Sequence, residues 1–562
     1  MKKSLNYFKT LTLTANQMVF FTCCYVALIL NLPFLFKTAH AITALDDYNL
    51  LFLLSMPIFL LFLCVILQSF LSFIWITKPI LIFTVICSSL IFYATISYGT
   101  VFDYGMVQNT IETDTAEAWS YLNFYAVVFF VIFGLIPSII IYSIRLSYQP
   151  FFAELFSRLK LIGLSLTVIA LISSVFYSNY AAVGRNNHEL ISYITPYKLL
   201  NSSYKYVRNQ YFTTPLQFKV LDTSPSIVRD SSRKHVTVMV LGETARAQSF
   251  SLNGYNKPTN HYTDKQGVVS FSNMHSCGTA TAVSVPCMFS RLNKQNYDKR
   301  VATSQQNVLD LINLAGADVL WISNNNGSCK GVCNRLKTIT IDTNQNDPLC
   351  DGEYCFDEAL LKPLDNKLNN LTEQNTLIVL HMIGSHGPTY FKRYPIEKRL
   401  FSPDCQRSDI QNCSEEELIN TYDNTIAYTD LVLSKVISHL SELAEADDVE
   451  TSLLYISDHG ESLGESGIYL HGLPYAFAPD EQTHVPMIYW NDGLQTDFNL
   501  TCLDASAKDR ITHDNVFDTL LSIMSVRSTA YDAQSDPFIQ CKSESAIART
   551  TVSSELEMEL LN

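Results

Sequence analysis

The sequence predicts two unlike parts: an N-terminal domain of five membrane-spanning helices and a C-terminal α/β domain with a mostly parallel central sheet. Three observations lead to this prediction. Five long apolar stretches lie within the first 183 residues, apolar runs alternate with helical patterns after residue 230, and only 16% of the 562 residues are charged. Soluble globular proteins have about a quarter charged residues, so part of the chain is expected to avoid water.

Charge and hydropathy argue against two classes of function. The formal net charge is −14, and no basic stripe offers partners for phosphates, which argues against binding to nucleic acid. Mean hydropathy is +0.11, too low for a transporter built entirely of membrane helices. Because 48% of the residues are nevertheless hydrophobic, the average combines an apolar part with a polar part.

Each of the five apolar stretches lacks charged side chains and is long enough to cross a hydrocarbon core about 30 Å thick, which takes about 20 helical residues. The stretches are residues 16–36, 49–76, 80–99, 121–144 and 161–183. Buried soluble helices produce one such run by chance, but not five. The first stretch is too long for a signal-peptide core and has no small-residue cleavage site behind it, so we expect it to be retained.

The distribution of lysine and arginine predicts a cytoplasmic N-terminus, because cytoplasmic loops retain positive charge. One side of the predicted membrane has Lys2, Lys3, Lys9, Lys78, Arg145, Arg158 and Lys160. The opposite side has Lys37, and its second loop, residues 99–120, has acidic residues but no basic one. Five spans then place everything after residue 183 outside the cytoplasm.

Cysteine usage supports the same topology. Four of the 14 cysteines lie inside the apolar stretches, where they behave as small apolar groups, and ten follow the last stretch. Nearest-neighbour pairing predicts the disulfides Cys277–Cys287, Cys329–Cys333, Cys350–Cys355, Cys405–Cys413 and Cys502–Cys541. Zinc knuckles are the alternative, but the spacings are irregular and no histidine recurs with them. An oxidising compartment is indicated, and we expect a bacterial inner-membrane protein with a periplasmic catalytic domain.

The predicted domains are a transmembrane domain (1–183), an interfacial bridge (184–230), a catalytic domain (231–550) and a tail (551–562). The bridge is polar and rich in tyrosine, and aromatic rings favour the membrane interface. In the catalytic domain, apolar runs predict strands over residues 235–241, 318–322, 376–381, 452–456 and 485–490. Helical patterns over residues 304–315, 356–371 and 415–444 separate them, and this alternation predicts the mostly parallel sheet.

Polar residues follow three of the predicted strands. Glu243 follows the first strand, His386 the third, and the pair Asp458-His459 the fourth. Ligands of open α/β sheets bind beyond the carboxyl ends of the strands, and oxygen and imidazole groups of this kind suit zinc. The sequence therefore predicts a metal site at this edge of the sheet.

Each of these residues also has an ordinary structural explanation. Glu243 alone is equally consistent with a capping or ion-paired carboxylate, and Asp458 with a turn residue that accepts backbone hydrogen bonds. His471 and His484 follow Asp458 along the chain and are further candidates for ligands or substrate contacts. Only the coincidence of these polar groups at predicted strand ends favours a site.

Residues 276–287 offer hydroxyl groups for a nucleophile. Cys277 and Cys287 flank the candidates Thr279, Thr281 and Ser284. A helix beginning near Thr281 would favour an anion at its N-terminus. A metal would also activate a bound hydroxyl, as zinc lowers the pKa of water from about 15.7 to about 7. The residues alone do not choose among the three hydroxyls, and a helix N-cap is the alternative role.

Four motifs resemble those of the lipid A phosphoethanolamine transferases, the EptA and MCR family. They are Leu241-Gly-Glu-Thr-Ala-Arg246, Ser276-Cys-Gly-Thr-Ala-Thr-Ala-Val-Ser-Val-Pro-Cys-Met-Phe289, His381-Met-Ile-Gly-Ser-His-Gly-Pro-Thr-Tyr390 and Ile456-Ser-Asp-His-Gly-Glu-Ser-Leu-Gly464. The similarity extends over almost the whole chain, including the five helices and the paired cysteines. It implies an alkaline-phosphatase-like, sulfatase-type fold.

The resemblance also implies the site residues. It implies one tightly bound Zn²⁺, with room for a second, and the ligands Glu243, Thr281, Asp458 and His459, with Thr281 as the nucleophile. It implies that the phosphoethanolamine group or a second metal is held by Thr279, Asn326, Lys330, His386 and His471. It further implies contacts to the lipid donor from Asn109 and Glu117.

The implied reaction transfers phosphoethanolamine from phosphatidylethanolamine to a phosphate of lipid A through a phosphothreonine-type intermediate, in a monomeric enzyme. Resistance to polymyxins and other cationic peptides would follow. Two alternatives stay open: a related membrane-anchored transferase with another glycan or lipid acceptor, and a receptor that binds an anion without turnover.

Overall fold

The computed structural model describes residues 11–43, 49–72, 76–113, 118–119, 121–186, 188–229, 231–325, 328–344, 347–492, 497–542 and 547. The chain forms two compact units. The membrane unit comprises residues 1–107 and 122–212, and the catalytic unit comprises residues 108–121 and 213–562. The segment 108–121 therefore groups with the catalytic unit, although membrane helices precede and follow it in sequence. The predicted tail, 551–562, lies outside the described residues.

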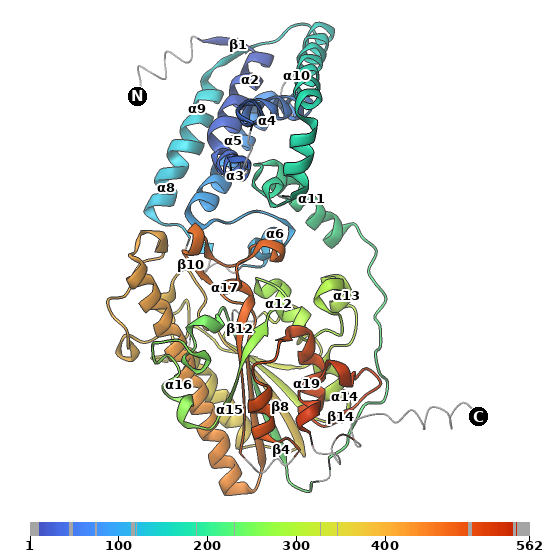
Figure 1. The fold of residues 1–562 in the computed structure, drawn as a ribbon, viewed down its shortest axis with the longest axis vertical. Helices are drawn as coiled ribbons and strands as arrows, with labels where there is room; N and C mark the ends of the chain where they lie inside the picture. Colours follow the sequence, from blue (N-terminus) through green and yellow to red (C-terminus); the bar gives the residue numbers. More distant parts are fainter. Residues whose placement is uncertain are drawn as a thin grey trace, which may run out of the picture. The chain divides into compact units, whose positions relative to one another are not determined.

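Four helices of the described chain are long and apolar enough to cross a membrane, and a bent pair of helices makes a fifth span if the pair is counted as one. The four are α4 (Leu50–Leu71), α5 (Thr77–Tyr98), the continuous helix Phe124–Ser143 and the first part of α10 (Phe151–Asn186). The third consists of α8 (Phe124–Phe130), a π-helical turn (Val131–Leu135) and α9 (Ile136–Ser143). Figure 1 shows these helices in blue to green.

The first span is bent, which corrects the expectation of one uninterrupted helix over residues 16–36. Ala15–Leu30, made of α2 (Ala15–Tyr25) and the π-helix Val26–Leu30, meets α3 (Leu32–Thr43) at 58°. The buried Asn31 lies at the break and donates to the carbonyls of Val26 (2.9 Å) and Thr195 (3.0 Å). A π-helical turn together with the nearby Pro33 accounts for the bend, because both disturb the regular ladder of helical hydrogen bonds.

Helix α10 begins ten residues before the apolar stretch that predicted it. Its first turns include Glu154 and Arg158, which form a buried ion pair at 3.6 Å. Pairing lowers the cost of holding charge within an apolar helix bundle. After α10, the 3₁₀ helix η4 (His188–Tyr193) and α11 (Tyr197–Tyr211) complete the membrane unit, and α11 carries exposed tyrosines.

The catalytic unit is built on an eight-stranded sheet in the order β13-β5-β12-β9-β4-β8-β6-β7. The strands are β4 (His235–Gly242), β5 (Val269–His275), β6 (Asp318–Ser323), β7 (Lys337–Thr340), β8 (Asn375–His381), β9 (Glu450–Ser457), β12 (His484–Asn491) and β13 (Ile511–Thr512). Only β12 runs antiparallel to its neighbours among these strands. The sheet is therefore mostly parallel, as predicted.

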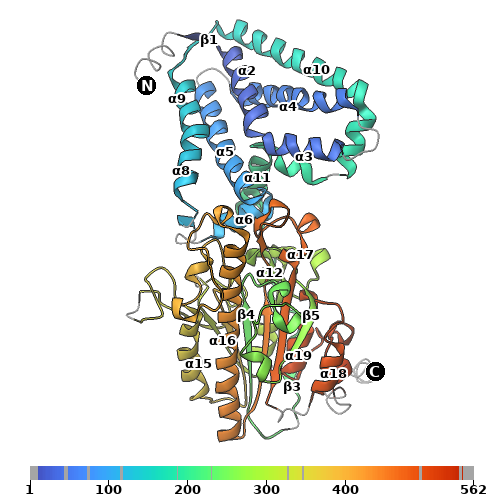
Figure 2. The same ribbon diagram turned by 60° about the vertical axis from the view of Figure 1, so that its left-hand side comes forward.

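Helices cover both faces of the sheet (Figures 1 and 2). The helices α15 (Leu361–Leu368) and α16 (Glu415–Asp447) cover one face, and α14 (Val308–Leu314) and α19 (Val516–Ile523) cover the other. The N-terminus of α16 has a capping box formed by Ser414 and Glu417. Strand β4 is buried along its entire length, which explains why its sequence is mostly apolar.

Three strands had no sequence signal strong enough to predict them. Strand β7 is exposed throughout, β13 has two residues, and β5 alternates buried and partly exposed positions instead of forming an apolar run. All three lie toward the edges of the sheet. Their pairing depends on neighbouring strands rather than on local composition.

Candidate metal centre and nucleophile

The register of the central strands brings the predicted site residues together. Leu241 of β4 pairs with His381 of β8 and with Ile456 of β9. Since all three strands end at the same level, the residues that follow them emerge side by side. The amide of Asp458 donates to the carbonyl of Gly242 (3.0 Å), which places Asp458 beside Glu243.

Glu243, Asp458 and His459 form a buried cluster. One ligand atom from each of the three side chains lies within 4.8 Å of the other two. The Nε2 atom of His459 is 3.3 Å from Glu243 Oε1 and 3.5 Å from Asp458 Oδ2. His459 Nδ1 lies 2.9 Å from the carbonyl of Gly460, so a proton on Nδ1 leaves the Nε2 lone pair facing the two carboxylates.

The electrostatics of the cluster favour a cation. Burial raises the pKa of Asp458 to about 7, and the carboxylate of Glu243 adds to this effect. Burial disfavours a charged His459, but the carboxylates of Asp458 and Glu243 outweigh it and raise the pKa of His459 to about 10. Two buried carboxylates this close to each other require a compensating positive charge.

Thr281 is the hydroxyl that reaches the cluster. Its Oγ1 donates to Glu243, with distances of 3.1 and 3.2 Å to the two carboxylate oxygens, and lies 3.4 Å from His459 Nε2. Thr281 is the first residue of α12 (Thr281–Met288), whose N-cap is Ala280. An alanine cap offers no side-chain acceptor, so the first amides of α12 have no capping side chain.

The other two candidate hydroxyls have structural partners instead. Ser284 Oγ accepts from the amide of Gly278 (3.0 Å), and Thr279 Oγ1 donates to the carbonyl of Leu473 (2.5 Å). The carbonyl of Thr279 also accepts from the amide of Gly472 at 2.8 Å. Thr279 thereby connects the loop that carries Thr281 to the loop that carries His471.

Three histidine rings lie next to one another at this edge of the sheet. The ring of His471 is centred 4.4 Å from that of His459 and 5.4 Å from that of His386. His471 Nδ1 lies 2.8 Å from Glu461 Oε2. Burial, together with the neighbouring His459, lowers the pKa of His471 to about 3. His484 is engaged elsewhere, because it stacks on His275 and hydrogen bonds to the Ser272 carbonyl.

Several buried residues that support the cluster were not predicted. Thr244 Oγ1 donates to Glu243 Oε1 (2.6 Å), and Asn325 Nδ2 donates to Glu243 Oε2 (2.7 Å). Glu461 accepts a hydrogen bond from Tyr390, and burial raises the pKa of this carboxyl to about 8. Thr244 and Glu461 lie within the quoted motifs, next to or near predicted ligands. This proximity in sequence could have marked them as candidate site residues.

The remaining predicted residues are partly described. Lys330 Nζ is 3.9 Å from Glu112 Oε2, and Glu112 also accepts from Lys299 Nζ at 2.7 Å. Asn109 lies on α6 (Tyr104–Glu112), and its carbonyl accepts from Thr113. Asn326 and Glu117 lie outside the described residues.

The donor set fits a zinc ion. Two carboxylates, one imidazole and one hydroxyl converge, and zinc takes oxygen and nitrogen ligands in a tetrahedral arrangement. Asp458 Oδ2 is buried and has no hydrogen-bond partner in the described part of the protein, as expected for an atom that binds a cation. The cluster thus has the composition and the unsatisfied atom that a metal site requires.

Five disulfides join cysteines of the catalytic unit. They are Cys277–Cys287, Cys329–Cys333, Cys350–Cys355, Cys405–Cys413 and Cys502–Cys541. The first closes the loop that carries Thr279 and Thr281, and it ties this loop to the end of α12.

Comparison with known proteins identifies the family. The Sulfatase family model matches residues 235–526, and the model described as Phosphoethanolamine transferase EptA/EptB matches residues 59–211. Phosphoethanolamine transferase EptA of Escherichia coli is 38% identical over 528 residues, which cover 92% of this chain and 95% of that one. The chain belongs to the EptA/MCR-type phosphoethanolamine transferases.

Two further relatives support this family assignment. Phosphatidylethanolamine transferase Mcr-1 of Escherichia coli is 37% identical and covers 88% of this transferase. The solved structure of the integral membrane lipooligosaccharide phosphoethanolamine transferase A from Neisseria meningitidis superimposes with a TM-score of 0.89 at 32% identity, covering 95% of this chain and 99% of that chain. The predicted enzyme class and the predicted sulfatase-like fold behind a helical membrane region are confirmed.

Proposed function

We propose that this transferase moves phosphoethanolamine from phosphatidylethanolamine to a phosphate of lipid A through a covalent intermediate on Thr281. One observation carries the proposal: the hydroxyl of Thr281 lies within hydrogen-bonding distance of Glu243, inside a buried set of cation ligands. Two relatives, a phosphatidylethanolamine transferase and a lipooligosaccharide phosphoethanolamine transferase, support the proposed donor and the proposed class of acceptor.

Glu243, Asp458, His459 and Thr281 would hold one Zn²⁺, and the other predicted residues would hold the phosphoethanolamine group or a second metal. When bound, Zn²⁺ supplies Lewis-acid chemistry that lowers the pKa of a hydroxyl it contacts. Thr244 and Asn325 fix the orientation of the Glu243 carboxylate through hydrogen bonds. Because one chain contributes the whole cluster, a monomer suffices.

The reaction has two displacements at phosphorus. Thr281 Oγ1 attacks the phosphorus of the donor, the bond from phosphorus to the glycerol oxygen breaks, and diacylglycerol leaves with a proton. A phosphate oxygen of lipid A then attacks the phosphothreonine, and the bond to Thr281 Oγ1 breaks. His386 and His471 are the candidates for proton transfer, because the ring of His471 lies beside those of His459 and His386 and an imidazole nitrogen can donate or accept a proton. Lys330 would offset negative charge on the transferred phosphoryl group.

The location we propose follows from charge and cysteine usage. The N-terminus would be cytoplasmic, the membrane unit would span the bacterial inner membrane, and the catalytic unit would be periplasmic. Five disulfides in the catalytic unit support an oxidising compartment. Asn109 and Glu117 would contact the lipid donor. The transferred group adds an amine and masks phosphate charge, so polymyxins and other cationic peptides would bind the modified membrane less well.

The test compares lipid A from cells that express the wild type, Thr281→Ala or Thr281→Ser. Mass spectrometry should show one added phosphoethanolamine group with the wild type, none with Thr281→Ala and a reduced amount with Thr281→Ser. Loss of the nucleophile should lower turnover by about 10³-fold or more. Unmodified lipid A from wild-type cells would overturn the proposed acceptor, and an active Thr281→Ala enzyme would overturn the proposed nucleophile.

Metal analysis of the purified full chain separates the metal from the nucleophile. Thr281→Ala should retain most of the zinc, because Glu243, Asp458 and His459 persist, whereas Glu243→Gln should lose zinc together with turnover. Treatment of the wild type with a chelator should abolish turnover, and added Zn²⁺ should restore it. Full turnover without zinc would exclude the metal from the proposed mechanism.

A further inference from the structure

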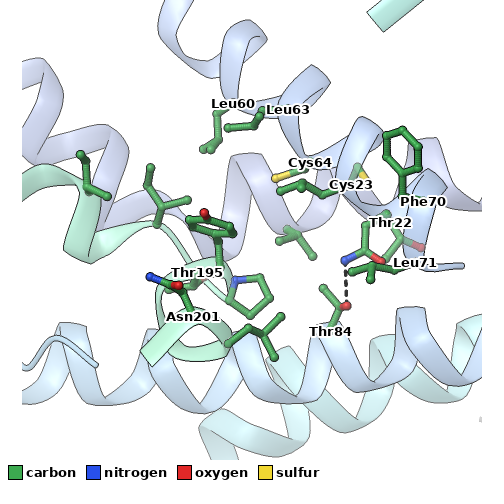
Figure 3. Close-up of a pocket in the computed structure, with 18 of the residues that line it drawn as sticks. Thr22, Cys23, Leu60, Leu63, Cys64, Phe70, Leu71, Thr84, Thr195 and Asn201 are labelled. Atoms are coloured by element: carbon green, nitrogen blue, oxygen red, sulfur yellow. Dashed lines mark hydrogen bonds between the residues drawn. The ribbon is translucent and has the colours of Figure 1, made fainter. Parts of the chain in front are cut away.

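The membrane unit contains an apolar cavity lined by its own residues. Its volume is about 600 Å³, within the range of about 300–1,000 Å³ typical of ligand sites. It is lined by the second half of α4, by parts of α2 and α5, and by residues between Ile191 and Tyr204. Figure 3 shows Leu60, Leu63 and Cys64 on one side of this space and Thr195 and Asn201 on another.

Two polar atoms in this lining lack partners. Gln68 is 7% exposed and donates from Nε2 to Thr84 Oγ1 (2.9 Å), but its Oε1 has no hydrogen-bond partner among the described residues. Thr195 is 6% exposed, and its Oγ1 also has no hydrogen-bond partner among the described residues. Buried polar atoms are almost always satisfied, so an apolar cavity with two unsatisfied oxygens at its wall indicates a ligand with a hydrogen-bond donor.

The lining also restricts the charge of the occupant. None of the described residues around the cavity is an aspartate, glutamate, lysine or arginine. A phosphate, an ammonium or a carboxylate placed there would be buried without a counter-ion, which is costly. A bare hydrocarbon chain would fill the space but leave Gln68 Oε1 unsatisfied. A neutral lipid with a hydroxyl group meets both requirements.

We propose that this cavity binds diacylglycerol, with one acyl chain between α4 and the segment that carries Thr195 and with the glycerol hydroxyl donating to Gln68 Oε1. The choice of lipid rests on the proposed function, because breaking the bond from phosphorus to the glycerol oxygen of the donor releases this neutral alcohol. The cavity would then hold the product lipid after it leaves the phosphorus, and it would discriminate against the charged donor.

Photolabelling of the full chain in detergent tests the proposal without turnover. The probe is a diacylglycerol with a diazirine on one acyl chain, applied to Thr281→Ala protein, and labelled peptides are identified by mass spectrometry. Label should map to residues 60–71 and 191–204. Unlabelled diacylglycerol should compete at least fivefold better than phosphatidylethanolamine with the same chains. Equal competition by the two lipids, or label confined to other segments, would overturn the proposal.

Two variants and one control variant sharpen the test. Leu63→Trp should fill the cavity and lower labelling at least fivefold, whereas Leu54→Trp, at an exposed position of the same helix, should leave labelling unchanged. Gln68→Leu keeps the volume but removes the acceptor. It should abolish most of the advantage of diacylglycerol over its O-acetylated analogue, which lacks the hydroxyl. Retained labelling in a folded Leu63→Trp protein, or an unchanged preference in Gln68→Leu, would contradict the proposal.

The photolabelling experiment can fail independently of the test of the proposed reaction. If lipid A is modified by the wild type but the cavity is not labelled, only the cavity proposal fails. If the cavity is labelled selectively but no phosphoethanolamine is transferred, the neutral-lipid site stands and the proposed reaction fails. Thermal unfolding of each variant shows whether a loss of label reflects a loss of fold.

Discussion

At the scale of single residues, the candidate metal centre depends on side chains and backbone atoms that hold the carboxylate of Glu243 in place. Its carboxylate accepts from Thr244, Asn325 and Thr281, and its backbone carbonyl accepts from the amide of Ser385 (3.0 Å). Gly384, just before Ser385, has a φ of +50°, a conformation that glycine adopts without strain. The proposed ligand Glu243 is therefore held by a neighbouring loop as well as by its own strand.

Gly384→Ala should displace Glu243 and lower turnover by about 100-fold, as expected for a misplacement of about 1 Å. A Cβ at position 384 would lie 2.6 Å from the carbonyl oxygen of Glu243, so the backbone would have to move. Turnover of a fluorescent phosphatidylethanolamine measures the effect.

Gly267→Ala is the matched control, since Gly267 also has a positive φ (+69°) but a Cβ there would meet nothing within 4 Å. It should cost about 1 kcal/mol of stability and leave turnover unchanged. Equal loss of activity in the two variants would show that strain in the left-handed backbone, not contact with Glu243, is responsible.

At the scale of secondary-structure elements, two features assemble the site. The common ends of β4, β8 and β9 bring the residues that follow them together, and the disulfide Cys277–Cys287 closes the loop before α12. The disulfide spans 10 residues, whereas the bond Cys502–Cys541 spans 39 residues in another part of the catalytic unit. Loop-closure entropy makes the longer bond the more stabilising one.

Removal of these two disulfides should therefore affect stability and activity in opposite order. The double variant Cys502→Ser/Cys541→Ser should lose roughly 4 kcal/mol of stability, and Cys277→Ser/Cys287→Ser roughly 3 kcal/mol. Turnover, measured well below the unfolding temperature, should fall more in the second variant, because its disulfide restrains the loop that carries Thr281. A larger loss of turnover in the Cys502/Cys541 variant would contradict a positioning role for the shorter bond.

At the scale of the whole molecule, stability should depend on pH through buried carboxyl groups outside the metal centre. Asp518 on α19 accepts from Arg291 (3.0 Å) and from the amide of Asp532 (2.8 Å). Burial raises the pKa of Asp518 to about 6, above its ordinary value of about 3.9. The folded chain thus holds a proton on Asp518 between about pH 4 and pH 6 that the unfolded chain releases.

The contribution of Asp518 to stability should be fully present below about pH 4 and should be lost as the pH rises through 6. Asp518→Asn removes this dependence, so its stability relative to the wild type should increase by about 2 kcal/mol between pH 4 and pH 7. Thermal unfolding across this range measures the difference. Asp509→Asn, at an exposed aspartate, is the matched control, and a pH-independent difference for Asp518→Asn would contradict the prediction.

Local composition was sufficient to predict the helical membrane region and the alternation of strands and helices, because apolar length and periodicity are properties of neighbouring residues. Polar residues that directly follow apolar strands likewise gave Glu243 and Asp458 as candidate site residues, and the hydroxyl-rich stretch between Cys277 and Cys287 gave Thr281 as one of three candidates. The bend at Asn31 was not predictable in the same way. It depends on hydrogen bonds to Thr195, a residue 164 positions away in the sequence.

Residue chemistry alone did not choose among Thr279, Thr281 and Ser284, although the family resemblance implied Thr281. The contacts of Thr244, Asn325 and Glu461 were visible only in the folded chain. The three hydroxyls are chemically equivalent in the sequence, and only strand register and the start of α12 direct one of them to Glu243. The cavity beside Gln68 has the same origin, because its walls come from segments more than a hundred residues apart. Residue chemistry is local, but contact between distant residues is set by packing, and packing decides which groups form the site.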